Sequence, residues 1–322
     1  VTGVNQHTWR INNPDRLQTL RNESEADIWF NFGFKPSYAP SEPEYGPDYL
    51  WAFPFLLDDP QLKRPMLLDA PGMYLNTTVP GGPPTADIYD SFVQLDMPID
   101  YFEHVEYQSE SKLAYLEGFA RYFDRLRTEH DYNFVSEPQM ARSVLTAMTS
   151  DIRIGRSWLQ YAIDRFKTKF GRGKHLTLTV EADTRGVPDL AGEYKNAVGV
   201  VFEPGETYAG SPLGTDSPIF MKQHNRLYVG LWGKTKLSVS WAKEPMHVVR
   251  ANVPIDIDIS EDGWSIGLNA DGMQQIKLYS PDPLTIEGAD LKIEHNPEQR
   301  TYTVTHYGAK TRIVVRRAPG GS

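Results

Sequence analysis

The stretch IDIDISEDGWSIGL, residues 255–268, determines the fold class of the C-terminal half of the chain. Isoleucine alternates with aspartate in its first half, and from Trp264 onward apolar residues alternate with other residues after an Asp262-Gly263 turn. A period of two with β-branched residues is typical of half-buried strands, and Asp-Gly between two such runs indicates a hairpin. The stretch therefore predicts two antiparallel strands with one face in a core.

The same alternation continues on both sides of this stretch. Further runs lie at residues 176–180, 237–241 and 302–306, separated by Gly, Pro, Asn and Asp. Short strands at regular spacing favour a sandwich of antiparallel sheets. We expect residues 174–322 to form an antiparallel β-sandwich, with two small β modules as the alternative.

The middle of the chain predicts helices. From Ser109, apolar residues recur every three or four positions as far as Leu126, which indicates an amphipathic helix. Ser136 precedes Glu137-Pro138-Gln139, an arrangement typical of a helix start. Residues 151–173 fit strand and helix equally, and we treat them as a linker.

Four short apolar runs in the first hundred residues end in polar residues. They lead into Asn5, Asn31, Asp69 and Glu103-His104, at a spacing of roughly thirty residues that suits strand–crossover–strand units. Active sites of α/β barrels are built at the carboxyl ends of their strands. Residues 1–150 are therefore predicted to be part of an α/β barrel, with these polar side chains at one mouth. Because four strands do not close a barrel, we expect the chain to begin inside the domain.

His104 is the candidate catalytic residue, because an imidazole at a strand end can act as a general acid or base near neutral pH. A hydrogen-bonded surface histidine is the alternative. Asn5, Asn31 and Asp69 are candidate substrate-binding residues. The aromatic side chains of Trp51 and Tyr101 are candidates for stacking on sugar rings. The carboxylate pairs Asp58-Asp59 and Asp256/Asp258 are interpreted as a turn and as a solvated strand face.

Composition excludes several classes of protein. The chain has 322 residues, a net charge of −9 and no cysteine. Binding of nucleic acid through phosphate neutralisation, disulfide scaffolds and thiolate zinc sites are therefore not expected. No run reaches the ~18 apolar residues of a membrane span. No histidine pair has metal-ligand spacing on a helix, so no metal ligand is identified.

Three segments resemble the polysaccharide deacetylases of the PelA type, which are carbohydrate esterases acting on biofilm exopolysaccharide. They are Val1-Thr2-Gly3-Val4-Asn5, then Pro98-Ile99-Asp100-Tyr101-Phe102-Glu103-His104, and Phe134-Val135-Ser136-Glu137 before the second helix. A later segment, 193–200, resembles the start of the β region that follows. The resemblance covers residues 95–202 and the first five.

The resemblance implies a metal-dependent N-deacetylase with a deformed (β/α) barrel, of which residues 1–150 are a part, and with His104 as the late acid. It implies a divalent metal, with zinc as the first choice, although no residue here matches the family's metal ligands or base. It also implies a periplasmic or extracellular location, a polysaccharide substrate and possible export-machinery partners. The alternatives are a carbohydrate-binding or assembly module and a glycoside hydrolase.

Overall fold

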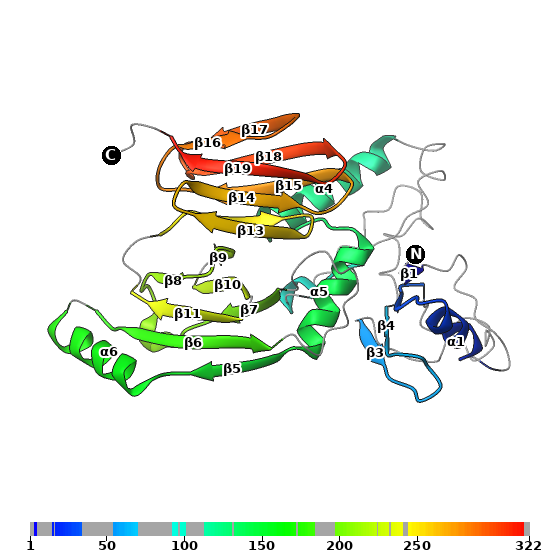
Figure 1. Cartoon of the computed structure of the whole chain (residues 1–322), viewed down its shortest axis with the longest axis horizontal. Coiled ribbons are helices and arrows are strands. Elements are labelled where there is room, and N and C mark those ends of the chain that lie inside the picture. Colours follow the sequence, from blue (N-terminus) through cyan, green and yellow to red (C-terminus); the bar gives the residue numbers. More distant parts are fainter. Residues whose placement is uncertain are drawn as a thin grey trace. The chain divides into compact units, whose positions relative to one another are not determined.

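The protein is described from a computed structural model (Figure 1). The residues that the structure describes are 3–4, 15, 17–33, 54–69, 92–95, 97–100, 113–130, 132–171, 173–183, 197–223, 225–231, 233–240 and 244–318. The chain divides into two compact units, Val1–Ala141 and Arg142–Ser322, which are described separately.

The first unit contains a small sheet with the strand order β1-β2-β4-β3. Its strands and the helix between the first two are β1 (Gly3–Val4), α1 (Gln18–Glu25), β2 (Phe30–Asn31), β3 (Phe55–Leu57) and β4 (Met66–Leu68). The pairs β1–β2 and β2–β4 are parallel, whereas β3 pairs with β4 in the antiparallel direction. Three of the four predicted apolar runs are therefore neighbouring parallel strands.

Burial of this sheet explains its continuous apolar runs. Leu20 of α1 packs with Met66 and Leu68 of β4 in one cluster, and all three are almost fully buried. A Cβ atom on Gly3 would lie 1.9 Å from the ring of Phe30. The β1–β2 pair therefore requires glycine at this position, because no side chain fits between the strand and that ring.

The fourth predicted strand is not formed where the structure describes it. Ile99 and Asp100 have no regular secondary structure, and the remainder of that run lies outside the described residues. Both predicted helices are confirmed, as α4 (Leu113–Glu129) and α5 (Glu137–Thr149). None of the helices in the described part of the chain is long and apolar enough to cross a membrane.

The described residues of the second unit form four small antiparallel sheets. Their strand orders are β5-β6-β11-β8, β7-β10-β9, β12-β15-β18-β17 and β13-β14-β19-β16. The strands are β5 (Asp151–Gly155), β6 (Leu176–Asp183), β7 (Val198–Phe202), β8 (Leu213–Thr215), β9 (Phe220–Gln223), β10 (Arg226–Leu231), β11 (Lys234–Val239), β12 (His247–Ala251), β13 (Ile255–Ser260), β14 (Gly263–Leu268), β15 (Gly272–Tyr279), β16 (Leu284–Glu287), β17 (Leu291–Asn296), β18 (Thr301–Gly308) and β19 (Thr311–Arg317). A short 3₁₀ turn, Glu206–Tyr208, follows β7. Figure 1 shows the strands running from β5 and β6 at one end of the unit to β16 and β17 at the other.

Each pair of sheets shares one hydrophobic core. The first core includes Val180 of β6 and Leu227 of β10, and the second includes Ile266 of β14 and Val304 of β18. The cores meet at β9 and β12, where Ile219 and Val248 form a parallel bridge. The buried ring of His247 links them, since it stacks on Phe220 at 3.6 Å between ring centroids.

The hairpin quoted at the outset is formed by β13 and β14, with Ile257 opposite Ile266. Its turn residues are Glu261-Asp262, since Ser260 pairs with Gly263. The aspartates on its outer face are not merely solvated, as the sequence suggested. Arg312 of β19 forms ion pairs with both Asp256 and Asp258.

Residues 151–173 contain a strand and a helix. β5 pairs with β6 over five residues, and α6 (Trp158–Phe170) then returns to the start of β6. Ser157 caps α6 by accepting a hydrogen bond from the Gln160 backbone N–H at 3.1 Å. The segment therefore belongs structurally to the second unit.

One edge of the second core's sheets is formed by β17. Its side chains after Leu291 are all exposed, and among the described strands it pairs with β18 alone. The Lys292 ammonium forms an ion pair with Glu294 at 2.7 Å.

Candidate functional site

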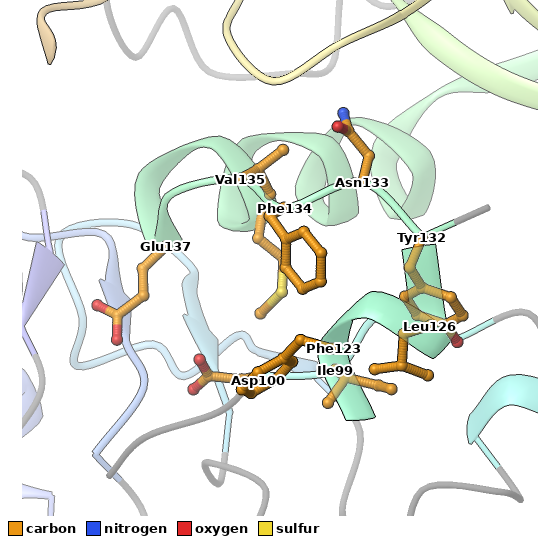
Figure 2. Close-up of a pocket in the computed structure, with 10 residues that line it drawn as sticks. Ile99, Asp100, Phe123, Leu126, Tyr132, Asn133, Phe134, Val135 and Glu137 are labelled. Atoms are coloured by element: carbon orange, nitrogen blue, oxygen red, sulfur yellow. The ribbon is translucent and has the colours of Figure 1, made fainter. Parts of the chain in front are cut away.

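A pocket of about 460 Å³ lies in the first unit, between the segment 99–100, α4 and the start of α5 (Figure 2). Its lining includes Ile99 and Asp100 from the first segment and Phe134, Val135 and Glu137 from the second. These positions belong to two of the segments that carry the resemblance described above. The fold thus brings together parts of the sequence that lie more than thirty residues apart.

Two contacts hold the walls of the pocket in place. The Tyr132 hydroxyl donates a hydrogen bond to the Met97 carbonyl oxygen at 2.8 Å, which ties the two segments together. The rings of Phe123 on α4 and Phe134 pack edge to face, with centroids 5.7 Å apart. The hydrogen bond and the ring contact fix where the segment 132–137 crosses α4.

The walls combine aromatic and aliphatic surface with two carboxylates. Phe134 remains 46% exposed although it lines the pocket, so its ring is accessible from solvent. In Figure 2 the carboxylates of Asp100 and Glu137 lie on the same side of this lining. Glu137 is in the first turn of α5, where the helix dipole favours a negative charge. The pocket therefore offers an apolar face for a ring and an acidic side for hydroxyl or ammonium groups.

The sheet places two of the predicted site residues side by side. Asn31 ends β2 and Asp69 follows β4, and the Asp69 backbone N–H donates to the Asn31 carbonyl oxygen at 3.1 Å. Both side chains are buried. The Asn31 amide group donates to both Glu23 carboxylate oxygens, at 3.0 and 2.9 Å, and accepts from the Gly33 backbone N–H. Asn31 thus fixes the link between α1 and the chain after β2.

The other predicted site residues, Asn5, Trp51, Tyr101 and His104, lie outside the described residues. Their convergence with Asn31 and Asp69 at one mouth stays a prediction. Asp100 of the pocket directly precedes Tyr101 in the chain. The pocket is therefore the described place nearest in sequence to the candidate catalytic histidine.

The resemblance implies zinc, which proteins hold through three or four His, Asp, Glu or Cys side chains. Within the described ranges, no three His, Asp or Glu residues come together as a metal-binding group. The residues seen here do not compose a zinc site, and we derive no catalytic step through a metal.

Three pocket residues were missed as site residues from the sequence, namely Asp100, Phe134 and Glu137. All three belong to segments that resemble the deacetylase family, which is the signal that the sequence contained. The sequence did not identify them as site residues, because only the fold shows that the two segments share a pocket.

Comparison of the chain with protein-family models, with curated proteins and with solved structures gives no match.

Proposed function

We propose that this chain binds an acetylated amino-sugar polysaccharide in the first unit and contributes to its N-deacetylation, as part of a PelA-type carbohydrate esterase. One observation carries the proposal. The segments that resemble this family, around Asp100 and Phe134-Val135-Ser136-Glu137, line the same pocket. The parallel order of β1, β2 and β4 agrees with a piece of a (β/α) domain.

The chemistry of the pocket suits an amino sugar. A pyranose ring presents a flat C–H face that packs on the exposed Phe134 ring, as apolar groups do on aromatic side chains. Carboxylates accept hydrogen bonds from hydroxyl groups, and bonds between charged partners are the stronger ones. Asp100 and Glu137 therefore favour a partly deacetylated polymer, whose free amines are cationic at neutral pH.

In the proposed reaction, His104 in its protonated form gives a proton to the amine that leaves the tetrahedral intermediate. General acid catalysis of this kind is worth about 10²–10⁴ in rate. A biofilm polysaccharide as substrate would favour a periplasmic or extracellular location.

Binding is tested by calorimetric titration of the chain with amino-sugar oligomers, fully acetylated and half deacetylated. We expect Phe134→Ala to weaken both, and Glu137→Gln to weaken mainly the half-deacetylated oligomer, each about tenfold. Val201→Ala, at a similarly exposed apolar position on β7, is the matched control and should change neither affinity. If Phe134→Ala and Glu137→Gln bind both oligomers with the same affinity as the Val201→Ala control, the pocket is not the binding site.

Catalysis is tested by acetate release from the acetylated oligomer with zinc supplied. We expect turnover in the chain or in a longer form that contains it, and a loss of about 10²–10⁴ in His104→Ala. Oligomer binding without acetate release in either form would favour the carbohydrate-binding module. Release of new reducing ends instead of acetate would favour the glycoside hydrolase.

A further inference from the structure

Helix α6 of the second unit buries a polar face. Asp164 is only 2% exposed, and its carboxylate accepts hydrogen bonds from Arg156 at 2.7 Å, Gln160 at 2.9 Å and the Thr177 backbone N–H at 2.8 Å. Thr177 is on β6, so these bonds fix the helix to its sheet. The helix is thus attached to the protein through charged and polar contacts.

The opposite face of α6 is apolar and exposed. It is formed by the stripe Leu159, Ile163, Phe166 and Phe170, whose spacing of four, three and four residues places them along one side of a helix. Their exposed fractions are 64%, 37%, 64% and 68%, and Trp158 at the start of the helix is 79% exposed. The Phe166 and Phe170 rings lie 4.7 Å apart, so they form a continuous patch. Large exposed apolar patches on folded proteins mark interaction sites.

Basic side chains accompany this stripe. Residues 151–170 contain five Lys or Arg and two Asp, a local net charge of +3 within a chain of −9. Beside the stripe, a pocket of about 510 Å³ is lined by Arg156, Arg165, Lys169 and His175. No carboxylate is among the described residues of that lining. Both the patch and the pocket therefore favour a partner that is apolar and anionic.

We propose that α6 seats the second unit on the surface of an anionic lipid bilayer. The helix lies in the plane of the membrane, with the stripe in the boundary between headgroups and acyl chains. The lysines and arginines contact lipid phosphates. One phosphate group enters the pocket lined by Arg156, Arg165 and Lys169. Trp158 sits at the interface, where tryptophan is enriched.

Two other occupants fit less well. A second copy would bring the same basic side chains against one another, and the one acid of α6, Asp164, is buried in its own contacts. A soluble polyanion would neutralise the charges but leave Phe166 and Phe170 in water. A bilayer satisfies the apolar and the charged part of the surface together.

The test is co-sedimentation of the whole chain with vesicles of phosphatidylcholine alone or with 30% phosphatidylglycerol. We expect binding to the anionic vesicles that weakens as salt rises. Phe166→Ser with Phe170→Ser, and separately Lys167→Glu with Lys169→Glu, should each lower the partition coefficient more than tenfold.

Matched controls are available on the strands of the same unit. Ile259→Ser with Tyr307→Ser removes apolar groups exposed by 58% and 68%, and Lys234→Glu with Lys236→Glu makes the same charge change on β11. Both controls should bind as the parent does. Three outcomes would each overturn the proposal: equal loss in the controls, no binding to anionic vesicles, or dimerisation through α6 in place of vesicle binding.

Discussion

Asp164 is a buried carboxylate held in its charged form. Burial raises the pKa of Asp164, but the hydrogen bonds from Arg156, Gln160 and the Thr177 backbone outweigh it and leave the pKa below its ordinary value. The group therefore stabilises the fold at neutral pH, and this contribution is lost as the pH falls below about 4.

Asp164→Asn tests this contact. The amide keeps the shape but loses the charge and turns one acceptor into a donor, so we expect a loss of about 1–3 kcal/mol in the stability of α6. Hydrogen exchange of the amides in residues 160–170 should become faster. Asp151→Asn, which removes an exposed pair with Arg153, is the control and should stay within about 0.5 kcal/mol. Unchanged exchange in Asp164→Asn would contradict the assigned role.

His247 is buried in its neutral form. Its Nδ1 lies 2.9 Å from the Pro245 carbonyl oxygen, which can only accept, so Nδ1 carries the proton. Desolvation lowers the pKa of His247 to about 4, although the Pro245 carbonyl and Glu244 act in the opposite direction. Lys222, which pairs with Glu244 at 3.1 Å, adds to the lowering.

The low pKa predicts how stability changes with pH. The unfolded chain binds a proton at His247 below about 6.5, whereas the folded protein does so only near 4. The contribution of neutral His247 to the free energy of unfolding is therefore fully present above about pH 6.5, and it falls by up to about 3 kcal/mol as the pH drops to about 4. Urea unfolding across this range should be less pH-dependent in His247→Gln than in the parent. An unchanged slope in His247→Gln would sink the idea.

At the scale of elements, the β13–β14 hairpin was read correctly from alternation alone. The turn was misplaced by one residue, because Asp-Gly was assumed to occupy its centre, whereas Gly263 is already paired with Ser260 in β14. Gly263 has a positive φ of 142° and a Cβ atom there would lie 2.5 Å from the Val315 carbonyl oxygen. Close approach of β19, a long-range contact, selects glycine at this position.

Gly263→Ala should therefore destabilise the second unit by about 1–3 kcal/mol, from backbone strain and the clash with Val315. Gly199→Ala on β7 is the matched control, since a Cβ atom there meets nothing within 4 Å. We expect the control to change stability by less than about 0.5 kcal/mol. The midpoints of urea unfolding measure both, and equal midpoints for the two variants would show that the approach of β19 imposes no constraint.

Helix α6 shows why residues 151–173 could not be assigned from the sequence. Its apolar residues have helical spacing, but Ile152 and Ile154 just before them alternate as in a strand. Apolar periodicity predicts the buried face of a helix only when its apolar side packs on the core. In α6 the buried side is instead the one that carries Asp164. Nothing local in the sequence shows that Asp164 would accept a hydrogen bond from Thr177.

At the scale of the whole molecule, local patterns predicted several strands of the second unit, among them β13, β14 and β18, and the helices α4 and α5, but they did not predict β5 or α6. They did not predict how the strands divide into four sheets, because pairing depends on contacts between distant segments such as Ile219 and Val248. The predicted site residues Asn31 and Asp69 are adjacent in the sheet, and their role in binding substrate stays a prediction. The sequence did not show that the Asn31 side chain donates to Glu23, because only the position of α1 reveals this partner.

The two cores of the second unit should unfold together. Phe220 belongs to the first core and stacks on His247, while its neighbour Ile219 packs against the second. We expect one calorimetric transition for the unit. Phe220→Ala should move this single transition to lower temperature and reduce the free energy of unfolding by about 3–5 kcal/mol. Two transitions, of which only one moves in the variant, would show that the cores are independent.

The outer strand β17 has a consequence for behaviour at high concentration. Unpaired backbone groups on a sheet edge are a template for strands of other molecules, and such pairing leads to aggregates and fibres. The ion pair of Lys292 and Glu294 lies on this strand. An incoming strand would have to desolvate these charges or set its own against them. The charges of Lys292 and Glu294 therefore disfavour edge-to-edge polymerisation through β17.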